Sequence, residues 1–378
     1  MALTKLTKNL IDGNFGTEWV STIQTSNFTA EAAKGYFVNT TSQVLYVTLP
    51  VGVVGAEIVI QDYAGTFATN EVILTANGSE KIQGSAIEGQ ITTNNATATL
   101  IYQDATKGWT SQDIGLVPQI VTFDYMLIGG GASGSQGSSG GGGGSGGLAV
   151  NTNQTLTTSI NITIGGGGAA GNPYYGNVGI ASTISGNITA NAPGGGIGGA
   201  NVGGAAGSPG YAGGTGLTIS NQWYLDGGGG GLGAVGQNAS SAGNGDGANG
   251  GVGINTYASW ATATSTGDGG FFGGGGGSYG WHRPGPNTYS DWNISTGVGG
   301  TGGGGNALPS GIANNSSADG TANTGGGGGN TGNASSTGGS GICIIRYSGA
   351  QAATGGTIVT SGGYTYHTFL TSGTLTRT

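Results

Sequence analysis

Residues 121–147 read VTFDYMLIGGGASGSQGSSGGGGGSGG, an apolar segment that passes directly into glycine. Its first eight residues, 121–128, predict a strongly apolar β-strand. A matching apolar segment, GICIIRY at 341–347, stands at the far end of the glycine-rich region. We therefore expect two β-strands to bracket the glycine-rich region.

The glycines between these two segments occur in runs rather than at a fixed period. The chain has 378 residues, of which 90 are Gly and 8 are Pro. The runs of three or more Gly are 129–131, 140–144, 165–168, 194–196, 227–231, 273–277, 302–305 and 325–329. Collagen is excluded because it needs Gly at every third position and abundant Pro. The variable spacing also argues against a solenoid of fixed repeat.

Glycine at this density is typical of disordered chains, because little apolar surface offsets the ordering entropy. An ordered alternative exists. A glycine run can adopt the extended three-residue helix, which rises ~3.1 Å per residue and has no internal hydrogen bonds. Without a Cβ, several such rods can approach closely and satisfy one another's backbone groups. We predict that residues 129–340 form a bundle of polyglycine II helices, whose loops carry the side chains.

The region before the first bracketing strand has an ordinary composition. Leu3, Leu6 and Leu10 have helical spacing and predict one or two amphipathic turns. From Gly35 to Trp109, short runs rich in Val, Ile, Thr and Tyr are separated by Gly, Asn and Asp turn signals. This pattern predicts a small antiparallel sandwich or barrel.

The last residues, 348–378, contain GGTIVTS and YTYHTFLTSGTLT around Gly362 and Gly363, which predict a β-hairpin. Within it, His367 is expected at an exposed strand position. The predicted fold class is all-β. The predicted domains are an N-terminal attachment or oligomerisation segment (1–35), a small β module (36–118), a glycine-rich polyglycine-helix domain (119–347) and a C-terminal hairpin (348–378).

Charge and hydropathy exclude several classes of partner. The formal net charge is −8 with only 8 Lys and Arg, and no basic cluster is present. Nucleic-acid binding needs clustered cations and is not expected. No apolar run reaches the ~18 residues of a membrane span, so membrane insertion is not expected, and the N-terminus lacks the apolar region of a secretory signal.

The sequence contains few residues of the types that catalyse reactions or bind metals. Two His residues, His282 and His367, leave little for a metal site or a catalytic triad, and the single Cys343 excludes an internal disulfide. The carboxylates of the glycine-rich region are isolated beside small residues, a setting typical of turns. GNGDGANGG at 243–251 is weakly similar to a calcium-binding nonapeptide but does not recur in tandem. We expect no enzyme activity, no cofactor and no metal site.

Aromatic residues interrupt the glycine-rich region and are its candidate binding residues. Tyr and Trp add binding area at low entropic cost. Equally, these rings could form the missing hydrophobic core. The candidates are Tyr174, Tyr175, Tyr211, Trp223, Tyr224, Phe271, Phe272, Tyr279, Trp281, His282, Tyr289 and Trp292.

Several stretches resemble glycine-rich tail fibres and adhesins of tailed bacteriophages, especially phages of marine bacteria and cyanobacteria. IQDYAGTFATNEVILTANGSEKIQG (60–84) and IYQDATKGW (101–109) are similar to a small β module of phage fibres. TFDYMLIGGGASG (122–134) and GGSGICIIRY (338–347) resemble the first and last segments of the phage glycine-rich domain. ATGGTIVTSGGYTYHTFLTSGTLT (353–376) is similar to a strand pair that more often precedes such a domain, and MALTKLTKNLI resembles the start of virion-attached fibres.

The resemblance implies a virion protein of the phage tail that recognises a bacterial surface receptor, either a glycan or an outer-membrane protein. It implies polyglycine-helix lattices with variable loops at the tip, other virion tail proteins as partners, and often a homotrimer. A purely structural fibre of the head, neck or tail is the alternative, in which the rings are buried. A depolymerase is a third option.

Overall fold

The computed structural model describes residues 17–86, 88–111, 117–118, 121–137, 140–157, 159–171, 175–199, 201–219, 223–240, 247–282, 293–309, 318–332, 336–349 and 351–377. The predicted helical turns at Leu3, Leu6 and Leu10 lie outside these residues. The chain divides into two compact units, Met1–Ile120 and Val121–Thr378. The described residues form an almost all-β fold with one short helix and no closed barrel, which confirms the predicted fold class.

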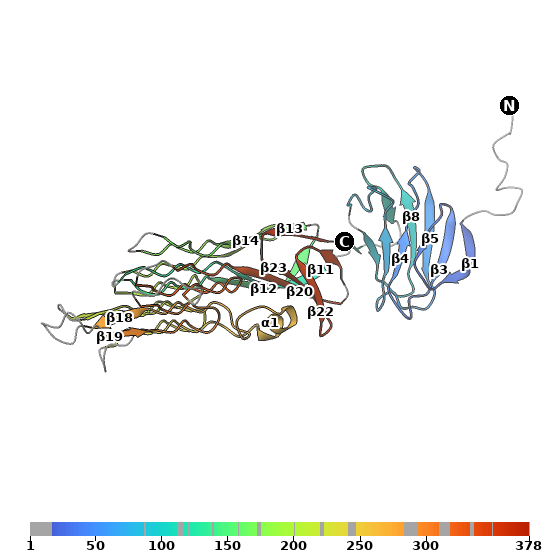
Figure 1. Ribbon diagram of the computed structural model, residues 1–378. Helices are drawn as coiled ribbons and strands as arrows, with labels where there is room; N and C mark the ends of the chain where they lie inside the picture. Colours follow the sequence, from blue (N-terminus) through green and yellow to red (C-terminus); the bar gives the residue numbers. More distant parts are fainter. Residues whose placement is uncertain are drawn as a thin grey trace, which may run out of the picture. The chain divides into compact units, whose positions relative to one another are not determined.

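The first unit is a sandwich of two five-stranded sheets (Figure 1). Its core contains alternate residues of both sheets, such as Ile58 and Ile60 from one and Val72 and Leu74 from the other. One sheet has the order β1 (Glu18–Gln24), β3 (Lys34–Val38), β5 (Glu57–Asp62), β8 (Thr97–Tyr102) and β9 (Trp109–Ser111). The other has the order β10 (Val117–Pro118), β7 (Gly89–Ile91), β6 (Val72–Thr75), β4 (Leu45–Thr48) and β2 (Phe28–Thr29).

The expectation of purely antiparallel pairing in this unit was wrong. From β1 to β6 the chain alternates between the two sheets, so β1, β3 and β5 pair in parallel, as do β2, β4 and β6. The buried carboxylate of Asp62 fixes the turn after β5, accepting N–H groups from Gly65 (2.9 Å), Asn95 (3.0 Å) and Phe67 (3.2 Å). This turn directs the chain to the opposite sheet, whereas a hairpin would have returned it to a position beside β5.

The second unit begins with another sandwich, and both of its sheets are antiparallel. Both expected bracketing strands are confirmed, and the structure adds that they are direct neighbours, with Ile128 opposite Ile342. One sheet has the order β12 (Leu148–Leu156), β11 (Val121–Ile128), β20 (Ile342–Ser348), β23 (Tyr364–Phe369) and β22 (Thr357–Ser361). The other has the order β15 (Ala190–Ala192), β14 (Ser182–Gly186), β13 (Ser159–Thr163), β24 (Gly373–Arg377) and β21 (Ala353–Thr354).

The C-terminal residues complete this sandwich. Strands β22 and β23 form a hairpin through Gly362 and Gly363, which both have positive φ, and β23 pairs with β20. Strands β21 and β24 belong to the opposite sheet, where β24 pairs with β13. Residues 351–377 are therefore integral to the second unit.

The sheet that contains β11 and β20 is apolar on both faces. Phe123, Leu127 and Ile345 pack against the opposite sheet. Met126 and Ile344 pack on the other face, under helix α1 (Ala258–Thr264) and its Trp260. Two buried faces explain why β11 and β20 read as continuous apolar runs rather than as alternating strands.

Extended segments, which we call rods, continue from the sandwich (Figure 1). In the rod 140–147, successive N–H groups donate to three different neighbouring segments, and the pattern repeats every third residue. From Gly141 to Gly147, the accepting carbonyls are those of Gly199, Gly227, Gly328, Gly196, Gly230, Gly325 and Pro193. Three residues per turn without internal hydrogen bonds is polyproline II geometry. The predicted polyglycine II bundle is confirmed for these residues.

Six segments surround the rod 140–147 in a closed ring. Three accept its N–H groups and three donate to its carbonyls, and each segment is hydrogen-bonded to the next one around the ring. In order they are 193–199, 202–207, 227–231, 273–277, 325–329 and 129–135. Hexagonal packing of this kind satisfies all the N–H groups of residues 141–147 and most of their carbonyls, as buried backbone groups require.

Five of the eight glycine runs lie inside the bundle and three lie on its outside. The rods 129–135, 140–147, 227–231, 273–277 and 325–329 are buried at every residue, whereas the runs 165–168, 194–196 and 302–305 are partly exposed. For most of the buried glycines in these runs, including Gly143, an added Cβ would lie closer than 3.0 Å to a backbone atom of a neighbouring segment. The core of this part of the molecule is therefore made of main chain.

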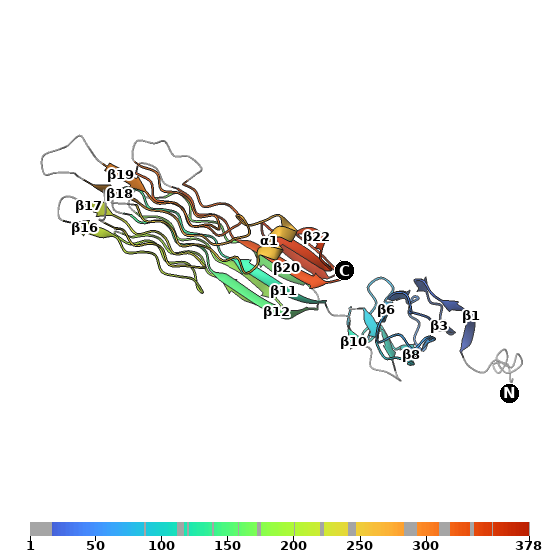
Figure 2. The ribbon, with the colours of Figure 1, turned by 90° about the horizontal axis from the view of Figure 1, so that it is seen from below.

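A four-stranded antiparallel sheet lies at the end of the rods farthest from β11 and β20 (Figure 2). Its order is β16 (Leu217–Ile219), β17 (Trp223–Leu225), β18 (Tyr279–His282) and β19 (Asn293–Thr296). We call it the distal sheet. The last described residues of the chain lie at the opposite end, in the sandwich, so the rods carry the distal sheet away from it (Figure 1).

Candidate functional site

The distal sheet brings together four of the twelve aromatic and histidine candidates. Strands β17 and β18 are adjacent, and their register places Trp223 opposite His282 and Tyr224 opposite Trp281. The two strands are more than fifty residues apart in the sequence. The sequence placed these residues in separate loops, whereas the structure shows them in paired strands.

Tyr279 is in the same strand but belongs to the core. It is 4 % exposed, and burial, together with the neighbouring Asp226, raises its pKa to about 12. Phe272 is likewise fully buried, at the sandwich end of the rods, where it packs with Met126 and Trp260. For these two rings the structure favours the core interpretation, because their surface is taken up by packing inside the unit.

The remaining candidates are dispersed. Tyr175 and Tyr211 are 57 % and 48 % exposed, on outer rods. Phe271 is half-buried beside the Asp268 turn near helix α1. Tyr174, Tyr289 and Trp292 lie outside the described residues.

The outer rods also expose aliphatic side chains that sequence reasoning did not select. Val178, Ile180, Ile197 and Val202 are between 38 % and 60 % exposed. They lie on three segments, 175–181, 193–199 and 202–207, that are hydrogen-bonded side by side, and these segments contain no charged residue. These residues are the non-glycine positions at which a rod faces outward. The sequence alone does not show which positions face outward, because that depends on how the rods pack.

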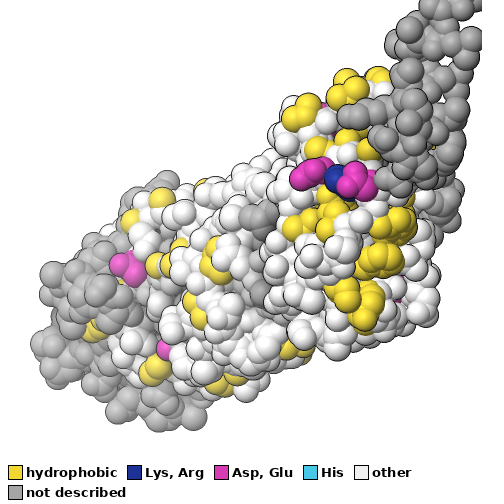
Figure 3. Space-filling model, turned by 90° about the vertical axis from the view of Figure 1, so that its right-hand side faces the viewer, with side chains coloured by type: hydrophobic (Ala, Val, Ile, Leu, Met, Phe, Trp, Pro, Cys, Tyr) yellow, Lys and Arg dark blue, Asp and Glu magenta, His cyan; other side chains and the backbone are white. Residues whose placement is uncertain are grey.

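Charged side chains gather elsewhere, on the first unit. Lys34 pairs with Glu18 at 2.9 Å, and Trp19 stacks on Phe37 nearby with ring centroids 4.5 Å apart. Figure 3 shows a basic side chain between acidic ones, with hydrophobic side chains around them. These contacts are local and assemble no set of catalytic groups.

His367 is buried, and the expectation of an exposed strand position was wrong. Its Nδ1 lies 2.7 Å from the carbonyl oxygen of Gly355, and its Nε2 lies 2.9 Å from the hydroxyl of Tyr347. That hydroxyl also accepts N–H groups from Ala352 and Ala353. The hydroxyl therefore donates its proton to Nε2, so His367 is neutral with its proton on Nδ1, and burial lowers its pKa. The network ties β21 to β23.

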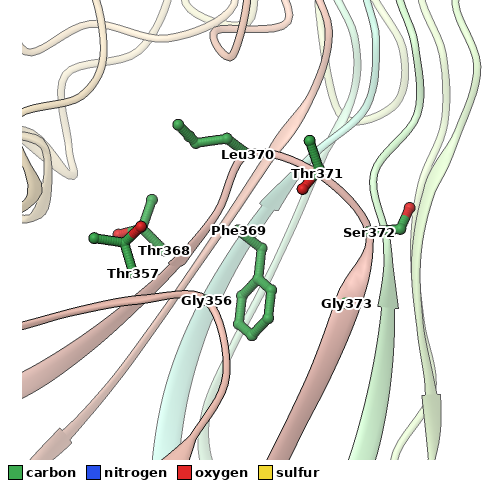
Figure 4. Close-up of a pocket in the computed structure, with 8 residues that line it drawn as sticks. All are labelled: Gly356, Thr357, Thr368, Phe369, Leu370, Thr371, Ser372 and Gly373. Carbon is green, nitrogen blue, oxygen red and sulfur yellow. The ribbon is translucent and has the colours of Figure 1, made fainter.

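A shallow hollow of about 280 Å³ lies in the sandwich between the β22–β23 hairpin and the start of β24 (Figure 4). Its lining is uncharged and rich in hydroxyl groups, with Phe369 and Leu370 as the apolar part. The lining residues are Gly356, Thr357, Thr368, Phe369, Leu370, Thr371, Ser372 and Gly373. The hollow lies at the other end of the unit from the distal sheet.

Two further properties of the described residues concern metal ions and membranes. They contain no group of three or more His, Cys, Asp or Glu side chains placed to bind a metal. No helix within them is long and apolar enough to cross a membrane.

The model of a family described as a glycine-rich domain matches residues 105–348, more than half of the chain. The chain belongs to this glycine-rich domain family. No curated protein matches the chain. The glycine-rich domain match ends at Ser348, yet β23 and β24 complete both sheets of its sandwich. In this chain the glycine-rich domain is therefore closed by residues that follow the matched region.

Proposed function

We propose that this protein is a bacteriophage tail fibre that binds a receptor on the host surface through the distal sheet and the segments next to it. The observation that carries the proposal is the register of β17 and β18, which pairs Trp223 and Tyr224 with His282 and Trp281 at the far end of the bundle. Membership of the glycine-rich domain family and the resemblance to phage fibres support it.

The mechanism follows from rigidity and ring chemistry. A lattice hydrogen-bonded in every lateral direction holds the distal sheet without long flexible linkers, so little entropy is lost on binding. Aromatic rings stack on apolar faces of sugars or fill apolar pockets of a protein, and neighbouring Asn, Ser and Thr side chains bond to hydroxyl groups. Binding of this kind needs no catalytic group, cofactor or metal, and we propose a non-enzymatic role.

The proposed setting is the virion tail, with other tail proteins as partners of the N-terminal region and a homotrimer as the assembled form. The alternative is a purely structural fibre of the virion without receptor contact. The burial of Phe272 and Tyr279 favours that alternative for these two rings, whereas the exposure of Tyr175 and Tyr211 favours contact.

The test is adsorption of the labelled full-length protein to a panel of marine bacterial and cyanobacterial strains and to lipopolysaccharides purified from them. We expect binding to at least one strain, and at least a tenfold loss of affinity for Trp281→Ala and Trp223→Ala. The matched control is Tyr63→Ala, an exposed ring of the first unit that is 55 % exposed. Absence of binding throughout, or equal loss for all three variants, would favour the structural alternative.

The mass of the protein in solution tests the homotrimer separately. Sedimentation equilibrium should give three times the 36.4 kDa of one chain. A mass of one chain at all concentrations would contradict the trimer but leave the receptor contact untouched.

A further inference from the structure

Two fully buried polar side chains near the distal end of the bundle have no hydrogen-bond partner. Neither carboxylate oxygen of Asp226 has a partner in good hydrogen-bond geometry, although the backbone amides of Asn201 and Gly140 lie near enough to lower its pKa, and both the amide nitrogen and the amide oxygen of Asn330 lack a partner. Each residue is 0 % exposed. Buried polar atoms are almost always satisfied, so an orphaned pair indicates a bound water or ion.

The rod periodicity shows that these two side chains converge. A Cβ on Gly229 or on Gly327 would point at the same atom, the carbonyl oxygen of Gly143. Asp226 lies three residues before Gly229, and Asn330 lies three residues after Gly327. Three residues make one turn of the rod, so the side chain of Asp226 points in the same direction as a Cβ on Gly229, displaced by one turn. The side chain of Asn330 has the same relation to a Cβ on Gly327.

They meet at the beginning of the central rod. The segment 227–230 runs parallel to 142–145, whereas 325–328 runs antiparallel to 143–146. Both displacements therefore run toward the beginning of the central rod. One turn before Gly143 is Gly140, so both side chains are directed at Gly140. Burial raises the pKa of Asp226 to about 7, and the backbone amides of Asn201 and Gly140 oppose this shift.

The described side chains around Asp226 supply oxygen atoms, and none of them is a Lys or an Arg. Ser278 donates its hydroxyl proton to the main-chain oxygen of Asp226, and the phenol of Tyr279 is buried nearby. Within the described part of the second unit, the only Arg residues are Arg346 and Arg377, in strands of the sandwich. A buried carboxylate without a counter-charge is costly.

We propose that Asp226 and Asn330 bind a hard metal cation of the calcium type at the beginning of the rod 140–147. A carboxylate, an amide oxygen and main-chain carbonyls are the ligands that such cations prefer, and Ca²⁺ tolerates irregular geometry better than Mg²⁺ does. The cation supplies the missing positive charge and locks the first turn of the central rod to two of its neighbours.

The test compares thermal unfolding of the full chain at pH 8 after refolding with CaCl₂ or with EDTA. We expect CaCl₂ to raise the unfolding midpoint by several degrees in the wild type, because ligands that bind only the folded state stabilise it. The shift should vanish in Asp226→Asn and persist in the control Asp268→Asn, whose carboxylate caps the N–H groups of Gly302 and Gly303 instead. MgCl₂ and NaCl should give smaller shifts.

A second readout keeps the proposal falsifiable if Asp226→Asn does not fold. Tb³⁺ replaces Ca²⁺, and its emission should be sensitised through Tyr279 and be displaced by CaCl₂. Elemental analysis of the dialysed wild type should find one calcium per chain. The proposal is overturned if CaCl₂ has no effect on the wild type while Asp226→Asn raises the midpoint equally in both buffers, since Asp226 is then a neutral buried acid.

Discussion

Gly143 sits at the centre of the lattice, and its missing side chain is the reason why the rods can touch. A Cβ there would lie closer than 3.0 Å to the carbonyl oxygens of Ala132 and Ser133. Gly166, in an outer rod, has only the end of the Ile180 side chain nearby, at 3.8 Å. Two glycines in similar runs therefore face opposite steric constraints.

We predict that Gly143→Ala destabilises the second unit by at least about 3 kcal/mol or prevents folding, because backbone must move in several rods at once. Gly166→Ala should be neutral or stabilise by about 0.4 to 1 kcal/mol, since Ala lowers the entropy of the unfolded chain. Urea unfolding followed by far-ultraviolet circular dichroism measures both. Similar losses for the two variants would contradict a core made of main chain.

His367 makes stability depend on acidity. Its pKa is lowered in the folded protein, so the unfolded chain binds more protons below about pH 6.5. The free energy of unfolding should therefore fall as the pH drops from about 6.5 through the lowered folded-state pKa. In His367→Gln, stability at pH 7.5 should be lower by about 1 to 3 kcal/mol, from lost hydrogen bonds, and this acid-dependent slope should disappear. A slope unchanged by the substitution would assign it to other groups.

At the scale of elements, Arg346 joins the helix to the sandwich. Its guanidinium lies 4.5 Å from the ring centre of Trp260 in α1 and 4.4 Å from that of Tyr364 in β23, and it pairs with Asp124 at 3.2 Å. A planar cation can stack on both rings and still pair with a carboxylate. The side chain therefore acts as a clamp between elements distant in sequence.

We expect Arg346→Ala to lower the free energy of unfolding by about 1 to 3 kcal/mol, from lost stacking and a partly buried ion pair. Arg346→Lys should recover less than half of this, because an ammonium keeps the charge but lacks the planar face. Trp260 fluorescence during urea unfolding provides the measurement. Full recovery by Lys would show that charge alone matters.

Elements whose side chains carry a pattern were predictable. The apolar runs 121–128 and 341–347 identified β11 and β20, and the glycine runs between them indicated rods. The partners of each rod were not predictable, because one glycine run is chemically identical to another. The register that places Trp223 beside His282 depends on this lattice, so the sequence revealed the candidate residues without their grouping. The parallel pairing of β1, β3 and β5 was missed because local turn signals do not show to which sheet the chain returns.

At the scale of the whole molecule, the two units have separate cores. One is formed by side chains such as Leu45 and Trp109, and the other by the second sandwich and the rods. We predict that residues 121–378 fold on their own, with the same unfolding midpoint as in the full chain within a few degrees. Scanning calorimetry of both proteins measures this. Aggregation of the shorter protein, rescued by adding back the first 120 residues, would contradict it.

The main-chain core also has a thermal consequence. Unfolding most proteins exposes mainly hydrocarbon and raises the heat capacity by about 12 to 15 cal/mol/K per residue, whereas newly hydrated peptide groups lower it. Since the rods bury peptide groups and little hydrocarbon, the second unit should show a markedly smaller increment per residue than the first. Its stability curve would then be unusually flat, so that the distal sheet is held as firmly in cold water as in warm.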